Sequence, residues 1–464
     1  MAPVHTHIAR RAVPVRGPTS PMLLVYSFFI VSVIGATLLW LPLSSPNSGF
    51  TSPVTAFFTA VSAMTGTGLI VVDTREAWTT FGHIVIAILI FIGGLGFMTG
   101  AAFLLFITGR RSSLQGRLVV GASLDDNRLG TIGVLARNII LMAIAVQIGG
   151  AIFFFIRFYV VGEIWPGVTL FQGLWQSVFT AISSFNNSGF EILPDEIVGG
   201  GSLIGLGRDI PALTIIGVMI LAGSTSYAVL ANVFVTRGWR RLTLDSKLVL
   251  VGIGVMLLIG FVAFISLEWT NPNTIGSEPV VSKVTQGVFH TVNRTAGFST
   301  IDYGQLHPAN MGVTEGLMFV GGASASTAAG IKVSTFMVIV IASIAIFGGR
   351  DRTTVFGREI PHANVQRAMA VGATAAAAVL ILMIALFAVQ PGLDFRTGMF
   401  EIISAFGTVG WSAGATSNLN EPAQIVVAIA MFTGRFGPIT LALVMAGREH
   451  QDPIRFAGER IRIG

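Results

Sequence analysis

Eight apolar stretches, each long enough to cross a lipid bilayer as a helix, dominate this sequence. A membrane-spanning helix needs about 20 consecutive apolar residues. The stretches are 22–43, 83–108, 138–161, 211–236, 247–268, 312–347, 367–390 and 422–446. Charged residues make up 11 % of the chain, whereas a soluble domain usually has about 25 %. The pattern therefore predicts an all-α polytopic membrane protein and excludes an ordinary soluble enzyme or a disordered chain.

Residue types that carry enzymatic chemistry are scarce in the chain. There is no cysteine, which excludes disulfides, thiolate metal sites and a cysteine nucleophile. The 7 histidines show no metal-binding spacing, and the sequence has no HExxH motif, GxSxG elbow or phosphate loop. The formal net charge of +6 reflects membrane topology rather than binding to nucleic acid. We therefore expect a protein that is not an enzyme, has no organic cofactor and binds no nucleic acid.

Clusters of arginine and lysine predict the topology. They lie at 10–16, 110–137, 237–247, 350–367 and 448–462, always on the same side of the predicted spans. By the positive-inside rule this side is cytoplasmic, so both termini are expected inside. Residues 1–21 are expected to form a cytoplasmic arm, because the apolar run after them has no signal-peptide cleavage site. The opposite face is acidic and would concentrate cations, although polar loops carry some charge in any protein.

Four shorter apolar segments lie between pairs of predicted spans, at 51–72, 169–192, 280–300 and 394–414. Each is too short to cross the membrane twice and ends in small residues, as a re-entrant segment does. They align when one glycine from each shares a column: Gly68, Gly189, Gly297 and Gly410. Six positions earlier every copy has a hydroxyl residue, and one position later every copy has a large apolar residue. Non-helical backbone at membrane depth lines a cavity or is buried in protein, so the four copies indicate a pore.

One glycine at each turn is what a four-part ion filter requires. A dehydrated potassium ion needs several oxygen ligands, and backbone carbonyls supply them without net charge. Glycine reaches the unusual dihedral angles that turn carbonyls inward at little cost. The candidate ion-binding residues are Thr67, Gly68, Ser188, Gly189, Ala296, Gly297, Val409 and Gly410. The alternative is that these glycines only end helices, which is common in membrane proteins.

The sixth apolar stretch, 312–347, is too long for one crossing at 1.5 Å per residue. Its middle is rich in small and polar residues, which predicts two half-helices joined by a loop at 321–332. A small-residue packing seam between helices is the alternative. Ionisable residues inside spans are usually functional, and Lys332 and Arg435 are the cations placed there. Arg435 is expected to act as an electrostatic barrier or to donate to the carbonyls and hydroxyls of this loop.

Four sequence strings resemble the filter loops of the Trk/Ktr/HKT potassium transporters. They are TGTGLIVVDT at 65–74, FNNSGF at 185–190, VNRTAGFST at 292–300 and FGTVGWSAG at 406–414. The resemblance covers about residues 22–447 and is closest to the Ktr-type bacterial membrane subunit. It implies four helix–pore-loop–helix repeats with pseudo-fourfold symmetry around one pore, and uptake of potassium. Gly66 departs from the family pattern, in which valine is expected at that position.

The resemblance divides the chain into six parts. They are a cytoplasmic arm 1–21, repeat 1 at 22–109, repeat 2 at 110–236, repeat 3 at 237–347, repeat 4 at 348–447 and a cytoplasmic tail 448–464. It also implies that the loop 321–332 is an intramembrane gate. The gate candidates are Gly321, Gly322, Ser324, Ser326, Thr327, Gly330, Lys332 and Arg435. Alanines within this loop depart from the more glycine-rich family form and would stiffen it or keep more of it helical.

The resemblance further implies partners and a location. We expect a homodimer in the inner (plasma) membrane, with a cytosolic RCK/KTN-type regulatory subunit ring that binds ATP or ADP. The Arg-rich segments 109–117, 237–241 and 350–358 would contact that ring, although anionic membrane lipid is a simpler partner for them. Potassium is the transported ion, and a role for sodium as an activator stays open. A sodium-coupled, alternating-access secondary transporter is the alternative function, and it would show two inverted repeats instead of four parallel ones.

Overall fold

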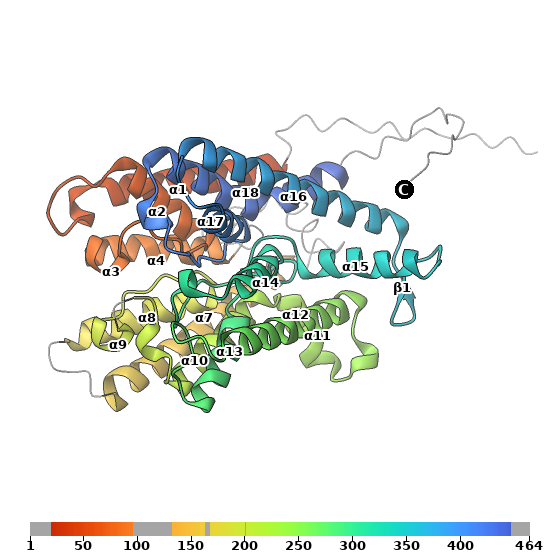
Figure 1. The fold of residues 1–464 in the computed structure, drawn as a ribbon, viewed down its shortest axis with the longest axis horizontal. Helices are drawn as coiled ribbons and strands as arrows, with labels where there is room; N and C mark the ends of the chain where they lie inside the picture. Colours follow the sequence, from red (N-terminus) through yellow and green to blue (C-terminus); the bar gives the residue numbers. More distant parts are fainter. Residues whose placement is uncertain (1–19, 96–131, 163–167, 200, 447–464) are drawn as a thin grey trace, which may run out of the picture.

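A computed structural model describes residues 20–95, 132–162, 168–199 and 201–446 of the chain. The described residues are mostly helical (Figure 1). The longer helices are α1 (Ser20–Trp40), α4 (Thr80–Gly94), α7 (Ile132–Phe154), α10 (Ile210–Ser224), α11 (Tyr227–Thr236), α12 (Leu244–Glu268), α14 (Pro308–Phe319), α15 (Val333–Phe347), α16 (His362–Val389) and α18 (Glu421–Ala446). A π-helical segment, Phe155–Val161, extends α7.

Four further helices coincide with the shorter apolar segments of the sequence. They are α2 (Pro53–Thr65), α8 (Leu170–Phe185), α13 (Val280–Val292) and α17 (Phe395–Gly407). Their first turns carry strong start signals, such as the capping box of Thr169 with Gln172 in α8 and the Asp394 cap of α17. Their last turns are buried in all four cases. Each helix therefore starts near a surface and ends inside the protein.

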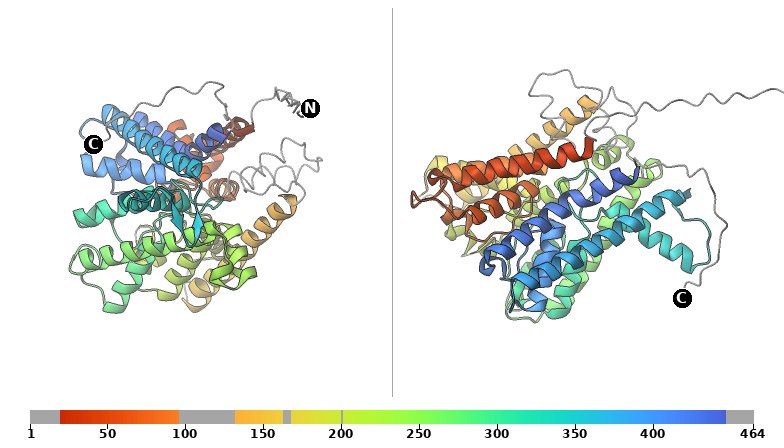
Figure 2. Two further views of the ribbon diagram at one scale, coloured as in Figure 1. Left: turned by 90° about the vertical axis from the view of Figure 1, so that its right-hand side faces the viewer. Right: turned by 90° about the horizontal axis from the view of Figure 1, so that it is seen from above.

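We group the helices in chain order into four units, α1–α4, α7–α11, α12–α15 and α16–α18, and their contacts follow one another around a closed circle. The second unit packs on the first through α4 and α8, the third on the second through α10 and α13, and the fourth on the third through α14 and α17. The circle closes where α18 packs on α1 and α2. In Figures 1 and 2 the blue C-terminal helices accordingly lie beside the red N-terminal ones. The ends of a long chain thus form neighbouring parts of one assembly.

Two of the predicted spans are broken. The break between α14 and α15 lies at residues 320–332, which confirms the prediction of two half-helices joined by a loop at 321–332. The break between α10 and α11 bends the two helices by 98°, and here the prediction of one continuous span over 211–236 is wrong. Thr225 has an extended backbone there, and the Ser226 hydroxyl accepts from the Val229 amide as the cap of a new helix.

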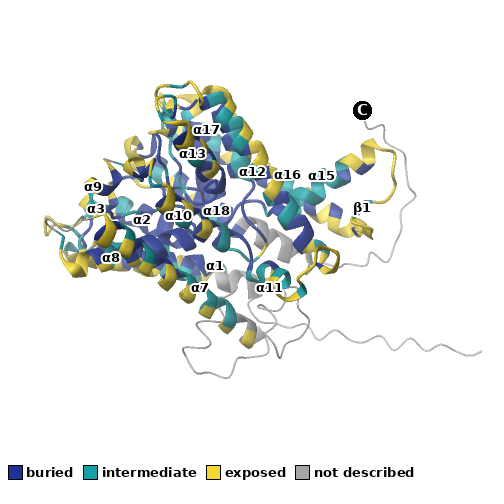
Figure 3. Cartoon of the chain, turned by 90° about the horizontal axis from the view of Figure 1, so that it is seen from below, coloured by how far each residue is buried: buried dark blue, intermediate teal, exposed yellow. Residues whose placement is uncertain are grey.

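In the described part of the chain, three helices are long and apolar enough to cross a bilayer alone: Arg137–Val161, Leu244–Glu268 and His362–Val389. The bent pair α10 and α11 adds a fourth only if the two are counted as one span. The predicted span 138–161 lies entirely within the described residues, whereas 96–108, the end of the predicted span 83–108, lies outside them. Figure 3 shows exposed residues along the outer faces of the helices and buried residues toward the centre.

The short elements complete the connections. Short helices lie at Thr74–Ala77 (α3) and Asp195–Val198 (α9), and 3-10 turns at Pro42–Ser44, Ile204–Leu206, Trp239–Arg241, Tyr303–Gln305 and Thr416–Asn418. Strands β1 (Thr354–Val355) and β2 (Arg358–Glu359) form an antiparallel hairpin. Phe356 and Gly357 both have positive φ, as a two-residue hairpin turn of this kind requires. The hairpin lies with the end of α15, away from the centre of the molecule (Figure 1).

Candidate functional site

The four aligned glycines lie in turns that follow the buried ends of α2, α8, α13 and α17. All four have positive φ: 82° at Gly68, 75° at Gly189, 71° at Gly297 and 100° at Gly410. A side chain at such a backbone angle is strained, because the β-carbon approaches the neighbouring carbonyl. Each position therefore requires glycine for its own backbone, before any contact with the rest of the protein is considered.

The four turns contact one another in a closed ring, which we call the glycine ring. A β-carbon added to Gly68 would lie closer than 3.0 Å to the carbonyl oxygen of Ser188, in the second turn. The same holds from Gly189 to Ala296 in the third turn and from Gly297 to Val409 in the fourth turn. A β-carbon at Gly410 would meet the carbonyl oxygen of Thr67, which returns the ring to its start. All eight candidate filter residues are thus brought together, two from each turn.

Backbone hydrogen bonds attach three of the four turns to the ends of their preceding helices in the same way. The amides of Thr67, Ser188 and Val409 donate to the carbonyls of Ser62, Ser183 and Ser404, at 2.8, 2.9 and 2.9 Å. In the third turn, the Ala296 amide donates instead to Asn293 at 2.9 Å. The hydroxyl residue six positions before the glycine bonds to the turn in two of the four copies, once as donor and once as acceptor. The Ser62 hydroxyl donates to the Leu69 carbonyl at 2.8 Å, and the Gly410 amide donates to the Ser404 hydroxyl at 3.1 Å.

The large residue after each glycine is buried in every copy: Leu69, Phe190, Phe298 and Trp411. The Trp411 indole stacks on Tyr303 with ring centroids 4.3 Å apart and donates to the Phe298 carbonyl at 2.8 Å. Trp411 therefore ties the return segment of the fourth turn to that of the third. These side chains wedge the return segments against the surrounding helices.

Glu401 is a structural residue of the fourth turn that sequence reasoning missed. It lies on α17, is fully buried, and accepts from the amides of Ala413 and Ala415 at 3.1 and 3.2 Å and from the hydroxyl of Ser412 at 2.5 Å. These groups belong to the segment that leaves the fourth turn. The sequence did offer one indication of this role, an acidic residue in a mainly apolar helix. A carboxylate that is buried there needs hydrogen-bond donors nearby.

The segment between α14 and α15, residues 320–332, is called the central loop here. A parallel bridge joins its ends, with the Gly321 amide donating to the Ile331 carbonyl at 2.8 Å. The loop rests on the α10 break, where the Ala323 amide donates to Ser224 at 2.9 Å and the Thr327 amide to Gly223 at 3.0 Å. The two broken spans therefore support each other.

Several candidate gate residues hold the central loop in its compact form. Gly330 has a φ of 70°, and a β-carbon on Gly321 or Gly322 would collide with loop or α10 backbone. The Lys332 ammonium donates to the Ala328 carbonyl at 2.6 Å, inside the loop. The Thr327 hydroxyl lies 3.0 Å from the side-chain amide group of Asn187, in the second turn of the glycine ring. The central loop thus touches the ring directly.

Arg435, on α18, is buried and donates to the carbonyls of Thr327 and Gly93. The expected contact with loop carbonyls is present, whereas the expected contact with loop hydroxyls is not found among the described residues. The Ser324 and Ser326 hydroxyls bond within the loop region, to Ser334 at 3.3 Å and to Ala328 at 3.4 Å. Because the Thr327 hydroxyl faces Asn187, its carbonyl is the group left for the guanidinium.

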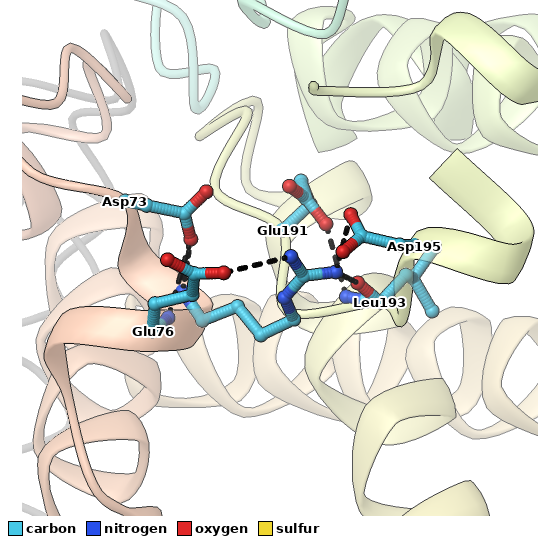
Figure 4. Close-up of polar contacts among 6 residues, drawn as sticks. Asp73, Glu76, Glu191, Leu193 and Asp195 are labelled. Carbon is cyan, nitrogen blue, oxygen red and sulfur yellow. Dashed lines mark hydrogen bonds and ion pairs between the residues drawn. The ribbon is translucent and has the colours of Figure 1, made fainter. Parts of the chain in front are cut away.

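A charged cluster lies beyond the first two turns (Figure 4) and is called the Arg75 cluster: Asp73, Arg75, Glu76, Glu191 and Asp195. The Arg75 guanidinium pairs with Asp195 at 2.8 Å and with Glu76 at 3.5 Å, and donates to the Leu193 carbonyl at 3.2 Å. It thereby links the segment after the first turn to the segment after the second. Four carboxyl groups thus lie near one cation, so acidic groups are in excess in this cluster.

The Glu191 carboxyl lies one residue beyond Phe190 in the second return segment. It accepts from the Leu193 amide at 2.9 Å. Burial raises the pKa of Glu191 to about 8, and Asp73 and Asp195 raise it as well, whereas the Leu193 amide and Arg75 lower it. The charge of the Arg75 cluster therefore changes near neutral pH. No group of three His, Asp or Glu side chains suited to a metal ion occurs among the residues that the structure describes.

Two of the three Arg-rich segments lie together at the opposite end of the chain's long helices. Trp239, in 237–241, packs edge-on against Phe356, in 350–358, with centroids 5.9 Å apart, and the Lys247 ammonium lies 6.0 and 5.8 Å from the two rings. The third segment, 109–117, lies outside the described residues. The fold thus unites two segments that are more than one hundred residues apart.

Comparisons with known proteins agree with one another. The sequence model of the family TrkH, described as cation transport protein, matches residues 3–454. The Ktr system potassium uptake protein B of Bacillus subtilis is 36 % identical over 96 % of this chain and 97 % of that protein. The potassium/sodium uptake protein NtpJ of Enterococcus hirae is 32 % identical over 97 % and 98 %. The crystal structure of the potassium transporter TrkH from Vibrio parahaemolyticus matches with a TM-score of 0.69 at 18 % identity, covering 94 % of this chain and 86 % of that one, which supports the fold.

Proposed function

Because the chain belongs to the TrkH family of cation transport proteins, we propose that it carries potassium into the cell through a selectivity filter formed by the glycine ring. Membership of this family makes the chain a multi-pass membrane transporter and not an enzyme. Relatives named as potassium uptake proteins favour potassium as the ion. The relative named as a potassium/sodium uptake protein leaves sodium as a second cation or an activator.

The closed glycine ring is the observation that carries this proposal. It gathers one carbonyl and one glycine from each of four segments that are far apart in the sequence. Backbone carbonyls can replace the hydration shell of a potassium ion without placing a net charge in the membrane. A ring of four such turns offers oxygens from all sides, which an isolated helix end cannot do.

The four half-helices add an electrostatic contribution to the ring. The C-terminal ends of α2, α8, α13 and α17 lead directly into the four turns. A helix C-terminus carries a partial negative charge, which favours a nearby cation. The same arrangement disfavours anions, so cation selectivity follows from the backbone alone.

The central loop is proposed as the gate. It contacts the glycine ring through Thr327 and Asn187, and Arg435 holds its carbonyl from α18. Movement of this loop would open a path beneath the ring, and the buried guanidinium would act as a cationic barrier while the loop is closed.

The Arg-rich side of the chain is proposed to face the cytoplasm, with both termini inside and the Arg75 cluster outside. The joined surface of 237–241 and 350–358 would meet the cytosolic nucleotide-binding regulatory subunit. A homodimer in the inner membrane completes the proposed assembly.

A sodium-coupled, alternating-access transporter is a second candidate, which the two broken spans favour. The two mechanisms differ in the gradient that drives potassium across the membrane. A filter passes potassium down its own gradient, whereas the coupled mechanism needs a sodium gradient.

Potassium uptake into cells that lack their own uptake systems tests the proposal, with sodium varied at each potassium concentration. We expect the wild-type chain to restore growth at low potassium, and the purified chain in liposomes to pass potassium with no sodium gradient. Uptake equal to the empty-vector control, with the protein present in the membrane, would refute potassium transport. Flux that appears only with a sodium gradient would favour the second candidate.

A further inference from the structure

Arg294 occupies an unusual position between the glycine ring and the central loop. It directly precedes the third turn and is 4 % exposed. Its guanidinium donates to three carbonyls: Leu317 at 3.2 Å, Val320, and Gly321 at 3.2 and 3.3 Å. It has no ion pair with a carboxylate among the described residues. A buried cation with only carbonyl partners is held by the geometry of those carbonyls.

The acceptors of Arg294 belong to the end of α14 and the beginning of the central loop. The last carbonyls of a helix have no partner inside the helix and carry its negative end. In a continuous helix the Leu317 carbonyl would accept from the Gly321 amide. Here the Gly321 amide donates to Ile331 instead, at 2.8 Å. The compact loop therefore leaves free the carbonyls that Arg294 uses.

A change in the central loop would consequently reach the third turn through one side chain. The Val320 and Gly321 carbonyls move with the loop, whereas Arg294 is fixed by its backbone to the ring. The hydrogen bonds of the Arg294 guanidinium all go to carbonyls at the end of α14 and the start of the central loop. A loop movement that withdraws these carbonyls would leave a buried cation without acceptors unless the third turn moves as well.

We infer that Arg294 is a positioning residue that couples the filter to the gate, so that opening of the central loop changes the ion selectivity of the third turn. This inference rests on the proposed function of both parts. Coupling between two sites is reciprocal, and typical values correspond to about 5- to 150-fold. Ion occupancy of the ring should therefore also bias the loop toward one of its states.

A mutant cycle of Arg294→Gln with Arg435→Ala tests the coupling in liposomes that contain the purified full chain. Two quantities are measured for each variant: the potassium/sodium permeability ratio and the basal potassium flux. We expect Arg294→Gln to lower the ratio at least about fivefold and also to raise the basal flux. Arg435→Ala, which releases the loop from the other side, should raise the flux and also lower the ratio. The potassium/sodium permeability ratio of the double variant should be no lower than that of the less selective single variant.

Lys283→Gln is the matched control. Lys283 lies on the same half-helix, α13, is buried, and donates to two carbonyls, Trp269 at 2.7 Å and Gly276 at 2.8 Å, but touches neither the ring nor the loop. It should leave the permeability ratio and the basal flux unchanged. Arg294→Lys keeps the charge and part of the bonding, so it should give an intermediate result and carries the test if the glutamine variant does not fold.

The outcomes separate the inference from the proposed function. Loss of potassium flux in the wild-type chain would refute the function. A selective wild-type chain in which Arg294 variants alter only the ratio, or in which Arg435→Ala alters only the flux, would refute the coupling. Additive effects on the ratio in the double variant would refute it too.

Discussion

At the scale of single residues, the glycine ring makes a strong demand on four positions. Glycine is needed there both for the backbone angle and because the next turn occupies the place of a side chain. A non-glycine residue in such a conformation costs about 1–3 kcal/mol. The neighbouring carbonyl must move in addition, so the oxygen ligands of an ion are displaced along with it.

Replacement of Gly68 tests this demand. Gly68→Ser should lower the potassium/sodium permeability ratio about tenfold, which corresponds to about 1.4 kcal/mol, because the new side chain displaces the Ser188 carbonyl. The ratio is measured from reversal potentials or from competitive uptake. Gly254→Ser is the control, since a side chain on this α12 glycine meets no atom within 4 Å. An unchanged ratio in the Gly68 variant would remove this glycine from the filter.

Glu191 predicts a pH dependence at the proposed outer mouth. Its pKa of about 8 means that the carboxyl is mainly protonated at pH 7 and gains its negative charge as the pH rises to 9. An added charge attracts potassium, so the apparent affinity for external potassium should rise with a midpoint near pH 8. The gain should be about fivefold or less, because one charge contributes about 1 kcal/mol at 4 Å in water.

Two variants check the source of that pH dependence. Glu191→Gln should abolish the midpoint near pH 8, whereas Asp302→Asn, which removes an acid following the third turn, should keep it. The measurement is potassium uptake kinetics between external pH 6 and pH 9.5. A midpoint that persists in Glu191→Gln would assign it to another group.

The residues of the ring could be located from the sequence because each column recurs in four copies. Their mutual contacts could not, since they depend on how the four units close. Arg75, Glu401 and the Gly93 carbonyl that accepts from Arg435 belong to this second class. Each of these contacts involves a residue that is distant in the sequence or a backbone group. Neither kind of partner can be inferred from the amino-acid types alone.

At the scale of elements, the two broken spans illustrate what sequence can and cannot reveal. The segment 321–332 contains three glycines and several hydroxyl residues, so a weak helix was evident there. The α10–α11 break has only Ser224, Thr225 and Ser226, which helices tolerate. It is stabilised by tertiary contacts, since a β-carbon on Gly223 would collide with the Phe185 carbonyl.

The central loop should restrict flux in the closed state. Deletion of about ten of its residues should raise basal potassium flux strongly, and Arg435→Ala should raise it partially because the tether and the cationic barrier disappear together. Arg435→Lys keeps the charge and serves as the control. Flux in liposomes is the measurement, with size-exclusion profiles to check assembly. A well-folded deletion variant with wild-type or lower flux would identify the segment as a packing seam.

At the scale of the whole molecule, two arginine-rich segments that are far apart in the sequence form one surface. Arginine-rich segments gather at one end, where Trp239, Lys247 and Phe356 join 237–241 to 350–358. The positions of the arginine and lysine clusters between the predicted spans were enough to predict that they share one side of the membrane. That two of these segments form one surface depends on the packing of α12, α15 and α16.

Charge reversal on that surface tests its role. Arg240→Glu combined with Arg352→Glu should weaken binding of a cytosolic regulatory subunit at least tenfold, as two repulsive charges of about 1 kcal/mol each imply. Pull-down or calorimetry with the purified subunit measures it. Arg208→Glu on the other face is the control. Unchanged binding of the subunit, with reduced binding to anionic vesicles, would assign the surface to lipid.

The most direct test of the whole account locates the ion itself. The full chain is crystallised in rubidium, which resembles potassium in size and scatters anomalously, and the anomalous map is calculated. We expect a peak inside the glycine ring, among the carbonyls of Thr67, Ser188, Ala296 and Val409, that weakens when sodium replaces rubidium and is lost in Gly68→Ser. A ring without a peak, in crystals whose rubidium binds elsewhere in the protein, would contradict the filter.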